Sequence, residues 1–388
     1  MTPVSDLNAN LPNRRVLLCD TTLRDGEQTA GVAFSLDEKI AIAKALDQVG
    51  VAEIEAGIAA MGDDDVAEIQ AIVKQVTHAA PVVWCRLRDY DLEMAAHCGT
   101  RRIHFAVPTS EAQLRGKLRA DRAWALSETQ RLVELATARG FDVSIGAEDA
   151  SRTDTSFLVA LAETAARAGA IRYRIADTLG ILDPMSAYRL AQELTARISL
   201  PLEIHAHNDF GLATANTIMA AIGGATHLSV TVNGLGERAG NAALEEVAAA
   251  MESGGLNTGI DLTALSHLSQ IVADASGRNL PEDKPITGKM VFAHEAGIHV
   301  DAILKNASTY EDPRCAPERF GRTRQFVLGK HSGTAGLRAA LNSAGLPSDD
   351  QILAALKPKL RAHAINTKRP VTASDLVAMV TRLALQEG

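Results

Sequence analysis

The segment Leu202–Gly211 reads LEIHAHNDFG, and its pattern identifies one strand of the fold. Apolar residues alternate with polar ones, which is typical of a β-strand, where residues two apart point to the same side. His205 and His207 therefore share one side, directly before the turn signal Asn208-Asp209. Two imidazoles in this arrangement can bind a divalent metal, although a pair of ordinary histidines at a strand end would show the same pattern.

A metal site on these histidines needs further ligands from elsewhere in the chain. The best candidate for a third ligand is Asp25, within the early run DTTLRDGEQ at residues 20–28. A candidate for a fourth is Asn241, which closes the run GLGERAGN at residues 234–241. Both runs follow apolar segments that we expect to be strands.

Short apolar runs rich in β-branched residues alternate with longer amphipathic runs on both sides of this segment. Expected strands lie at 16–19, 52–56, 81–85, 102–107, 142–147, 172–176, 202–206 and 227–232. Expected helices lie at 36–49, 63–76, 110–139, 154–168, 184–197, 214–222 and 242–252, and a further helix after the third strand ends at Met94. Ser35 and Glu38 predict a capping box at the start of the first helix. Eight strand–helix units predict an α/β fold with a parallel sheet closed into a (β/α)8 TIM barrel. An open doubly wound sheet is the rival, but its GxGxxG fingerprint is missing, as is a P-loop.

Polar residues lie within or directly after the carboxyl-terminal parts of all eight expected strands, where barrels of this kind carry their chemistry. They are Arg24, Asp25, Gln28, Glu55, Arg86, Arg88, His104, Glu148, Asp149, Asp177, Thr178, His205, His207, Asn233 and Asn241. Each has an ordinary explanation by itself, as a helix cap or a surface charge. Their coincidence at every strand end favours a functional site.

The pattern changes beyond the barrel. We expect a catalytic barrel over 16–258, a linker and lid over 259–328, and a helical subdomain over 329–388. Expected helices in this part lie at 261–275, 334–344, 349–364 and 374–385.

Composition excludes several classes of protein. The chain has 388 residues, 46% of them hydrophobic, and a net charge of −8 without a basic block, which argues against nucleic acid and an anionic membrane as partners. No run is long and apolar enough for a transmembrane helix, and the start, Met1 to Arg15, has no apolar signal core. The four cysteines are scattered without a CxxC motif, which is typical of a reduced, cytoplasmic protein.

The runs DTTLRDGEQ, HAHND and GLGERAGNAALEE, together with FAHEAGIHVD at 292–301, resemble the acetyl-CoA-dependent 2-oxoacid condensing enzymes. These are the isopropylmalate, citramalate and homocitrate synthases, which are metal-dependent TIM barrels. The resemblance covers residues 16–332. The segments TAGVAF at 29–34 and AAMG at 59–62 look most like the homocitrate synthases of nitrogen-fixing bacteria. The chain also ends without the regulatory domain of full-length isopropylmalate synthases.

The resemblance implies roles for single residues. Asp25, His205, His207 and Asn241 would hold a divalent cation (Mg, Mn or Zn) on which the 2-oxoacid chelates. Arg24 would stabilise the oxyanion, Gln28 would hydrogen-bond the substrate, and Thr178 would bind its carboxylate. Glu148, His299 and Tyr310 would share the acid–base work on acetyl-CoA, the co-substrate. The segment carrying His299 would reach the partner's barrel, so a homodimer with shared active sites is implied.

The substrate that the resemblance implies is 2-oxoglutarate, with (R)-homocitrate for the nitrogenase iron–molybdenum cofactor as product. Lysine-branch homocitrate synthases carry Glu at the position of Asp25 and Arg at that of Ser144, so this chain lies outside that branch. Arg88, Arg86 and His104 remain candidates for the distal carboxylate, with Arg88 slightly preferred. 2-Isopropylmalate or citramalate synthesis, from 2-oxoisovalerate or pyruvate, is the alternative. A related lyase is disfavoured because the loop 234–240 lacks a cysteine, and the retained site residues disfavour a non-catalytic binding protein.

Overall fold

The computed structural model describes residues 14–387, so most of the N-terminal segment expected to lack a signal core lies outside the described residues. The chain divides into two compact units: a barrel unit, residues 14–280 and 285–287, and a C-terminal unit, residues 281–284 and 288–387. The sequence-based division into three parts stays a prediction. No helix among the described residues is long and apolar enough to cross a membrane.

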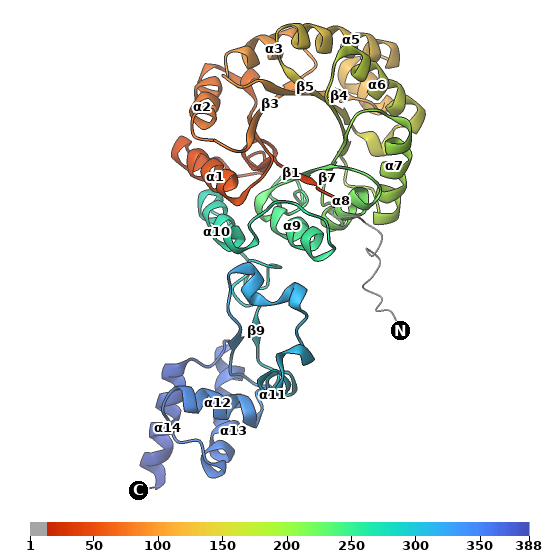
Figure 1. Cartoon of the computed structure of the whole chain (residues 1–388). Helices are drawn as coiled ribbons and strands as arrows, with labels where there is room; N and C mark the ends of the chain where they lie inside the picture. The colour runs from red at the N-terminus through yellow and green to blue at the C-terminus, as the bar shows by residue number, and fades with distance from the viewer. Residues whose placement is uncertain (1–13, 388) are drawn as a thin grey trace. The chain divides into compact units, whose positions relative to one another are not determined.

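Eight parallel strands close into a barrel in chain order, because β1 pairs with both β2 and β8. They are β1 Leu17–Asp20, β2 Glu53–Gly57, β3 Ala80–Arg86, β4 Arg102–Pro108, β5 Asp142–Glu148, β6 Arg172–Asp177, β7 Leu202–Ala206 and β8 His227–Val230. Figure 1 looks into this ring of strands, and the helices surround it. The predicted TIM barrel is confirmed.

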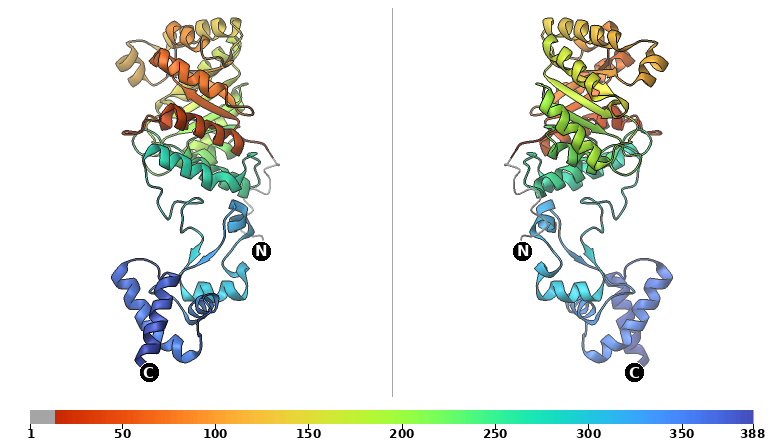
Figure 2. Two further views of the ribbon diagram at one scale, coloured as in Figure 1. Left: turned by 90° about the vertical axis from the view of Figure 1, so that its left-hand side faces the viewer. Right: turned by 90° about the vertical axis from the view of Figure 1, so that its right-hand side faces the viewer.

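The helices of the barrel unit lie along the outside of the strands (Figure 2). They are α1 Leu36–Val49, α2 Asp63–Val73, α3 Asp89–Ala96, α4 Glu111–Gln113, α5 Arg122–Ala138, α6 Thr155–Ala168, α7 Pro184–Arg197, α8 Ala213–Ile222, α9 Leu244–Ser253 and α10 Leu265–Ser276. The predicted capping box is present, because Ser35 caps α1 and Glu38 accepts the Ser35 backbone N–H at 2.7 Å.

The helical region expected over 110–139 is present, but residues 119–121 interrupt it. After α4, a short π-helical turn, η4 Leu114–Leu118, ends at Arg119, whose φ of 53° is left-handed. Asp121 then caps α5 by accepting the N–H of Trp124 at 2.8 Å. The left-handed residue and the new cap separate two helical segments, and the turn between them carries Lys117 toward the end of β5.

The barrel interior is unusually ionic. Charged residues two apart on β2 and on β6, and Glu203 of β7, point inward, because alternate residues of a strand share one face. These five residues, together with Arg102 of β4 and Arg24 after β1, form one alternating series of ion pairs, which we call the interior ion-pair chain: Arg102, Glu53, Arg172, Glu203, Arg174, Glu55 and Arg24. Six of the seven are buried, and Arg102 is half-buried.

The C-terminal unit has its own short sheet and helices. Strands β9 Ala293–His294 and β10 Gln325–Phe326 are parallel. The helices are α11 Gly297–Lys305, α12 Thr334–Ser343, α13 Asp350–Thr367 and α14 Ala373–Glu387. Leucines such as Leu341, Leu353 and Leu356 form an apolar core between the last three helices.

Candidate metal centre at the barrel mouth

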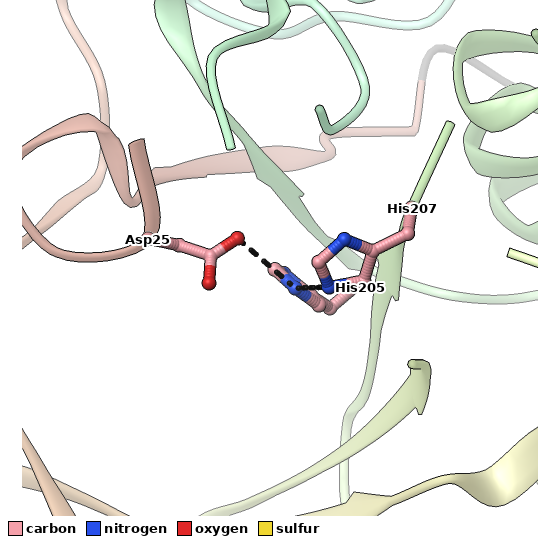
Figure 3. A group of neighbouring side chains, drawn as sticks. All are labelled: Asp25, His205 and His207. Carbon is pink, nitrogen blue, oxygen red and sulfur yellow. Dashed lines mark hydrogen bonds and ion pairs between the residues drawn. The ribbon is translucent and has the colours of Figure 1, made fainter. Parts of the chain in front are cut away.

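Three predicted ligands come together at the carboxyl ends of β1 and β7. Asp25 lies on η2, the π-helical turn Thr22–Gly26 that follows β1, and Thr21 caps that turn. His205 lies on β7, and His207 follows it and forms an antiparallel bridge with Asn241. Figure 3 shows the Asp25 carboxylate pointing across the barrel mouth toward the two imidazoles.

The ligand atoms converge on one point. The Nε2 atoms of His205 and His207 lie 3.2 Å apart, and Asp25 Oδ2 lies 3.7 Å from His205 Nε2. Ligand atoms of all three residues lie within 4.8 Å of one another. Asn241 donates from Nδ2 to Asp25 Oδ2 at 2.5 Å, so the predicted fourth residue adjoins the same point.

The local electrostatics keep the ligands in their binding forms. Burial lowers the pKa of His205 to about 3 and also lowers the pKa of His207, so both imidazoles are neutral at pH 7. Burial acts to raise the pKa of Asp25, but Arg24 and the two histidines outweigh it and lower that pKa to about 2. Neutral imidazoles and an ionised carboxylate are the forms that ligate a metal.

The residues present fit a divalent cation. The amide oxygen of Asn241, Oδ1, is buried and has no hydrogen-bond partner, which is costly unless another group satisfies it. Ser229 Oγ lies 2.8 Å from His205 Nδ1 and so fixes the ring with Nε2 toward the cluster. A carboxylate, two imidazoles and an amide oxygen suit magnesium, manganese or zinc.

Arg24 is held beside this cluster in a fixed orientation. Its Nε donates to Glu55 Oε2 at 2.7 Å and its Nη1 to Asp25 Oδ1 at 2.8 Å. The guanidinium also lies 5.5 Å from the ring centroid of Trp84. Its third nitrogen, Nη2, makes no hydrogen bond to any residue that the structure describes, so it is available to a ligand.

Two hollows meet at this end of the barrel. A cavity of about 180 Å³ contains the metal-ligand cluster, and a groove of about 1090 Å³ adjoins it. Both are lined by Trp84, Ala106, Lys117 and Glu148. Lys117 Nζ lies 2.8 and 3.1 Å from the two Glu148 oxygens, so this ion pair marks their junction.

The other predicted site residues of the barrel unit fall into two groups. Thr178 and His104 line the site cavity, where Thr178 Oγ1 accepts the N–H of Asp149 at 2.8 Å and His104 Nδ1 lies 2.9 Å from Ser144 Oγ. Gln28 is exposed and lines a separate cavity with Arg24.

The structure does not bring Arg86, the last residue of β3, or Arg88, which follows that strand, to the metal-ligand cavity. Arg88 is exposed at the N-cap of α3, and Arg86 pairs with Asp91 through two guanidinium nitrogens at 2.9 Å. Both line the larger groove instead.

The remaining predicted pair lies in the C-terminal unit. The rings of His299, on α11, and Tyr310 lie against each other in a tilted arrangement, with centroids 4.1 Å apart and planes inclined by 32°. The two residues therefore form one group, as an acid–base pair would require. Their roles stay predictions.

Three residues of this site were missed in the sequence: Arg174, Lys117 and Ser229. Arg174 and Lys117 line the site cavity, and Ser229 orients His205. A signal for Arg174 was present, because two arginines alternate within the expected strand at 172–176. Such charges in an inward-facing strand must be paired or bind a ligand.

Comparisons with known proteins agree with this architecture. A family model described as HMGL-like matches residues 15–272, and one described as homocitrate synthase post-HMGL domain-like matches residues 286–368. The chain is 47% identical to a homocitrate synthase of Frankia alni over 88% of this chain and 97% of the relative. It is 44% identical to 2-isopropylmalate synthase 2 of Caldanaerobacter subterraneus, over 94% of this chain and 95% of the relative.

Two further matches extend this picture. The (R)-citramalate synthase of Methanocaldococcus jannaschii is 40% identical over 94% of this chain and 74% of the relative. The crystal structure of the Bacillus subtilis HMG-CoA lyase matches with a TM-score of 0.63 and 20% identity, over 70% of this chain and 96% of that one, which shows a shared fold. Relatives named for different 2-oxoacid condensations are thus similarly close, and overall identity does not separate their substrates.

Proposed function

The chain belongs to the HMGL-like family, in the group of metal-dependent condensing acyltransferases that includes the homocitrate, 2-isopropylmalate and citramalate synthases. On this basis, we propose that the protein condenses acetyl-CoA with 2-oxoglutarate. The condensation forms a carbon–carbon bond and gives a CoA thioester, and water then hydrolyses that thioester to release (R)-homocitrate and CoA. Homocitrate of this origin serves the nitrogenase iron–molybdenum cofactor. The observation that carries the proposal is the small cavity that combines three metal ligands with arginine and lysine side chains.

The metal-ligand cluster is the proposed binding site for the keto end of the substrate. A divalent cation bound there supplies Lewis-acid polarisation of the keto oxygen. Arg24 is placed to stabilise the negative charge that develops on that oxygen, because its Nη2 is available while Glu55 and Asp25 fix its other nitrogens. Thr178 lines the same cavity and can donate a hydrogen bond to the adjacent carboxylate.

The larger groove is the proposed binding site for acetyl-CoA. Its cationic lining consists of Arg86, Arg88, Arg115, Lys117 and Arg119. These side chains can pair with the phosphates of CoA. Trp124 in the same groove offers a face on which a base can stack.

Glu148 lies at the junction through which the acetyl methyl must reach the keto carbon. Its carboxylate can take up or position a methyl proton there, and His299 and Tyr310 are the other candidates for this transfer. We propose that His299 and Tyr310 act from the partner subunit of a homodimer. Mixing a His299 variant with an Arg24 variant should then restore activity in hybrid dimers, whereas no recovery after verified subunit exchange would place His299 in its own active site.

One experiment tests the substrate. The purified protein is supplied with manganese or magnesium, acetyl-CoA and 2-oxoglutarate, 2-oxoisovalerate or pyruvate at equal concentration. CoA release is followed with a thiol reagent, and the product is identified by mass spectrometry. The highest kcat/KM with 2-oxoglutarate is expected. A preference for 2-oxoisovalerate or pyruvate would instead assign 2-isopropylmalate or citramalate synthesis, which the similar identity of those relatives keeps as the second candidate.

A further inference from the structure

We propose that Arg174 on β6 pairs with the distal carboxylate of the 2-oxoacid and thereby selects a dicarboxylic substrate. This inference rests on the proposed function, because it names the group that recognises 2-oxoglutarate in the same cavity. Arg174 lines that cavity together with Asp25, His205 and His207. Its side chain is otherwise buried in the barrel interior.

Strand register places Arg174 at the depth that the substrate requires. Ala176 is paired with His205 across β6 and β7, and Arg174 is paired with Glu203, so Arg174 lies two residues below the metal-ligand layer. Two residues of a strand span about 6.6 Å. The distal carboxylate carbon of 2-oxoglutarate lies three carbon–carbon bonds of about 1.5 Å beyond the keto carbon. A substrate held by its keto end at the metal ligands, with its carbon chain extended along the barrel axis, would bring its distal carboxylate toward this layer, where Arg174 lines the same cavity.

Arg174 is held in place yet keeps one nitrogen for a ligand. Its Nε donates to Glu203 Oε1 at 2.8 Å, and its Nη2 lies 2.5 Å from Glu55 Oε1. Its Nη1 makes no hydrogen bond or ion pair with any residue between 14 and 387. A guanidinium fixed on two sides with its third nitrogen available is already oriented for a carboxylate.

The environment of Arg174 supports the same assignment. The interior ion-pair chain continues to the metal-ligand layer, because Arg24 also pairs with Asp25, so its four arginines face four carboxylates. Arg174 Nη1 is the nitrogen of this guanidinium that these pairs leave without an acceptor. A distal carboxylate would supply that acceptor in the barrel interior, whereas an apolar 2-oxoacid would not.

The other cations near the cavity are less suitable. Lys117 is paired with both oxygens of Glu148. His104 is neutral at pH 7, because burial and then the neighbouring Arg174 hold its pKa well below the usual value. Arg24 belongs to the metal-ligand layer through its contact with Asp25.

The test compares two arginines of one strand. Arg174→Met removes the proposed carboxylate partner. Arg172→Met is the matched control, because Arg172 also bridges two glutamates and faces inward but does not line the site cavity. For each variant, kcat/KM is measured for 2-oxoglutarate and for 2-oxopentanoate, which has the same number of carbon atoms but no distal carboxylate. Calorimetric titration of the manganese-loaded protein with each 2-oxoacid, without acetyl-CoA, measures binding separately.

In Arg174→Met, the ratio of kcat/KM for 2-oxoglutarate to that for 2-oxopentanoate should fall by about 100-fold or more, since a buried charge-assisted pair is lost. Arg172→Met should keep the wild-type ratio. If Arg174→Met folds poorly in thermal unfolding, Arg174→Met combined with Glu203→Gln removes one charge of each sign and is expected to show the same loss of preference. A folded Arg174 variant that keeps the wild-type ratio overturns the inference and leaves the proposed function intact. A wild-type enzyme that rejects 2-oxoglutarate overturns both.

Discussion

The two units of this chain are stabilised by opposite kinds of interior. The barrel interior contains the ion-pair chain from Arg102 to Arg24, in which each of the three glutamates contacts two arginines. The core of the C-terminal unit is apolar, with Leu341 and Leu356 completely buried among other leucines and valines. Side chains that fill a barrel are usually bulky and branched, so the ionic interior is the exception that needs an explanation.

The difference between the ionic and the apolar interior reflects the location of the candidate site, which lies in the barrel. Buried ion pairs contribute little net stability compared with apolar packing of the same volume, because both partners lose their hydration. Their value here lies in orientation, since Glu55 fixes Arg24 next to the metal ligands while also holding Arg174. The C-terminal core only has to pack three helices together, and leucines do this without polar groups to satisfy.

The largest effect is expected at the metal-ligand cluster. His205→Ala or His207→Ala removes a direct metal ligand. Mutation of a residue that only hydrogen-bonds to a ligand typically costs about 10- to 100-fold in metal affinity or activity, so loss of the ligand itself should cost more. We therefore expect a loss of more than about 100-fold in turnover with an intact barrel. Turnover and manganese affinity are measured after chelator treatment and metal addition. His227→Ala, at the opposite end of the barrel interior, is the control, and wild-type-like turnover in either ligand variant would refute the metal assignment.

The next largest effect is expected on turnover when Glu148, at the junction of the site cavity and the larger groove, is replaced. Glu148→Gln keeps the shape of the side chain but removes its ability to accept a proton, and acid–base groups typically contribute about 100- to 10,000-fold to a rate. Turnover should fall in that range while calorimetric binding of 2-oxoglutarate is retained. Glu237→Gln is a useful control, because Glu237 lines the site cavity but not the groove. Equal losses in both variants would count against a specific role of Glu148.

A third prediction compares the two interiors directly by shape-conserving substitutions. Glu203→Gln should destabilise the barrel unit by about 3–5 kcal/mol, because it leaves Arg172 and Arg174 without a shared counter-charge. Leu356→Met should cost less than about 1.5 kcal/mol in the C-terminal unit. Denaturant unfolding followed by tryptophan fluorescence reports on the barrel unit, which contains both Trp84 and Trp124, and calorimetry follows the whole chain. Similar small costs at both positions would show that the ionic interior is no more sensitive than the apolar one.

Local patterns in the sequence were sufficient for the fold. The alternation of strands and helices, the capping box at Ser35 and the shared face of His205 and His207 depend on neighbours in the chain, so they could be predicted. The role of Arg174 could not, because it depends on the register of β6 against β7 and on the partners Glu55 and Glu203 from other strands. Arg88 shows the same limit, since β3 ends at Arg86 and Arg88 becomes the exposed N-cap of α3. Where a side chain points after a strand end is decided by the loop, which has no simple period.

The smallest expected effect is on metal affinity, and it should distinguish two serine–histidine pairs that have nearly identical geometry. Ser229 Oγ lies 2.8 Å from His205 Nδ1, and Ser144 Oγ lies 2.9 Å from His104 Nδ1. Only His205 is a proposed ligand, so Ser229→Ala should lower metal affinity by about 10- to 100-fold, because the imidazole loses the contact that orients its Nε2. Ser144→Ala should leave metal affinity unchanged, since His104 lies outside the ligand cluster. Competition with a fluorescent chelator measures both variants under the same conditions. If both serines lowered metal affinity equally, the effect would come from general loosening of the barrel interior, and the specific support of His205 by Ser229 would have to be abandoned.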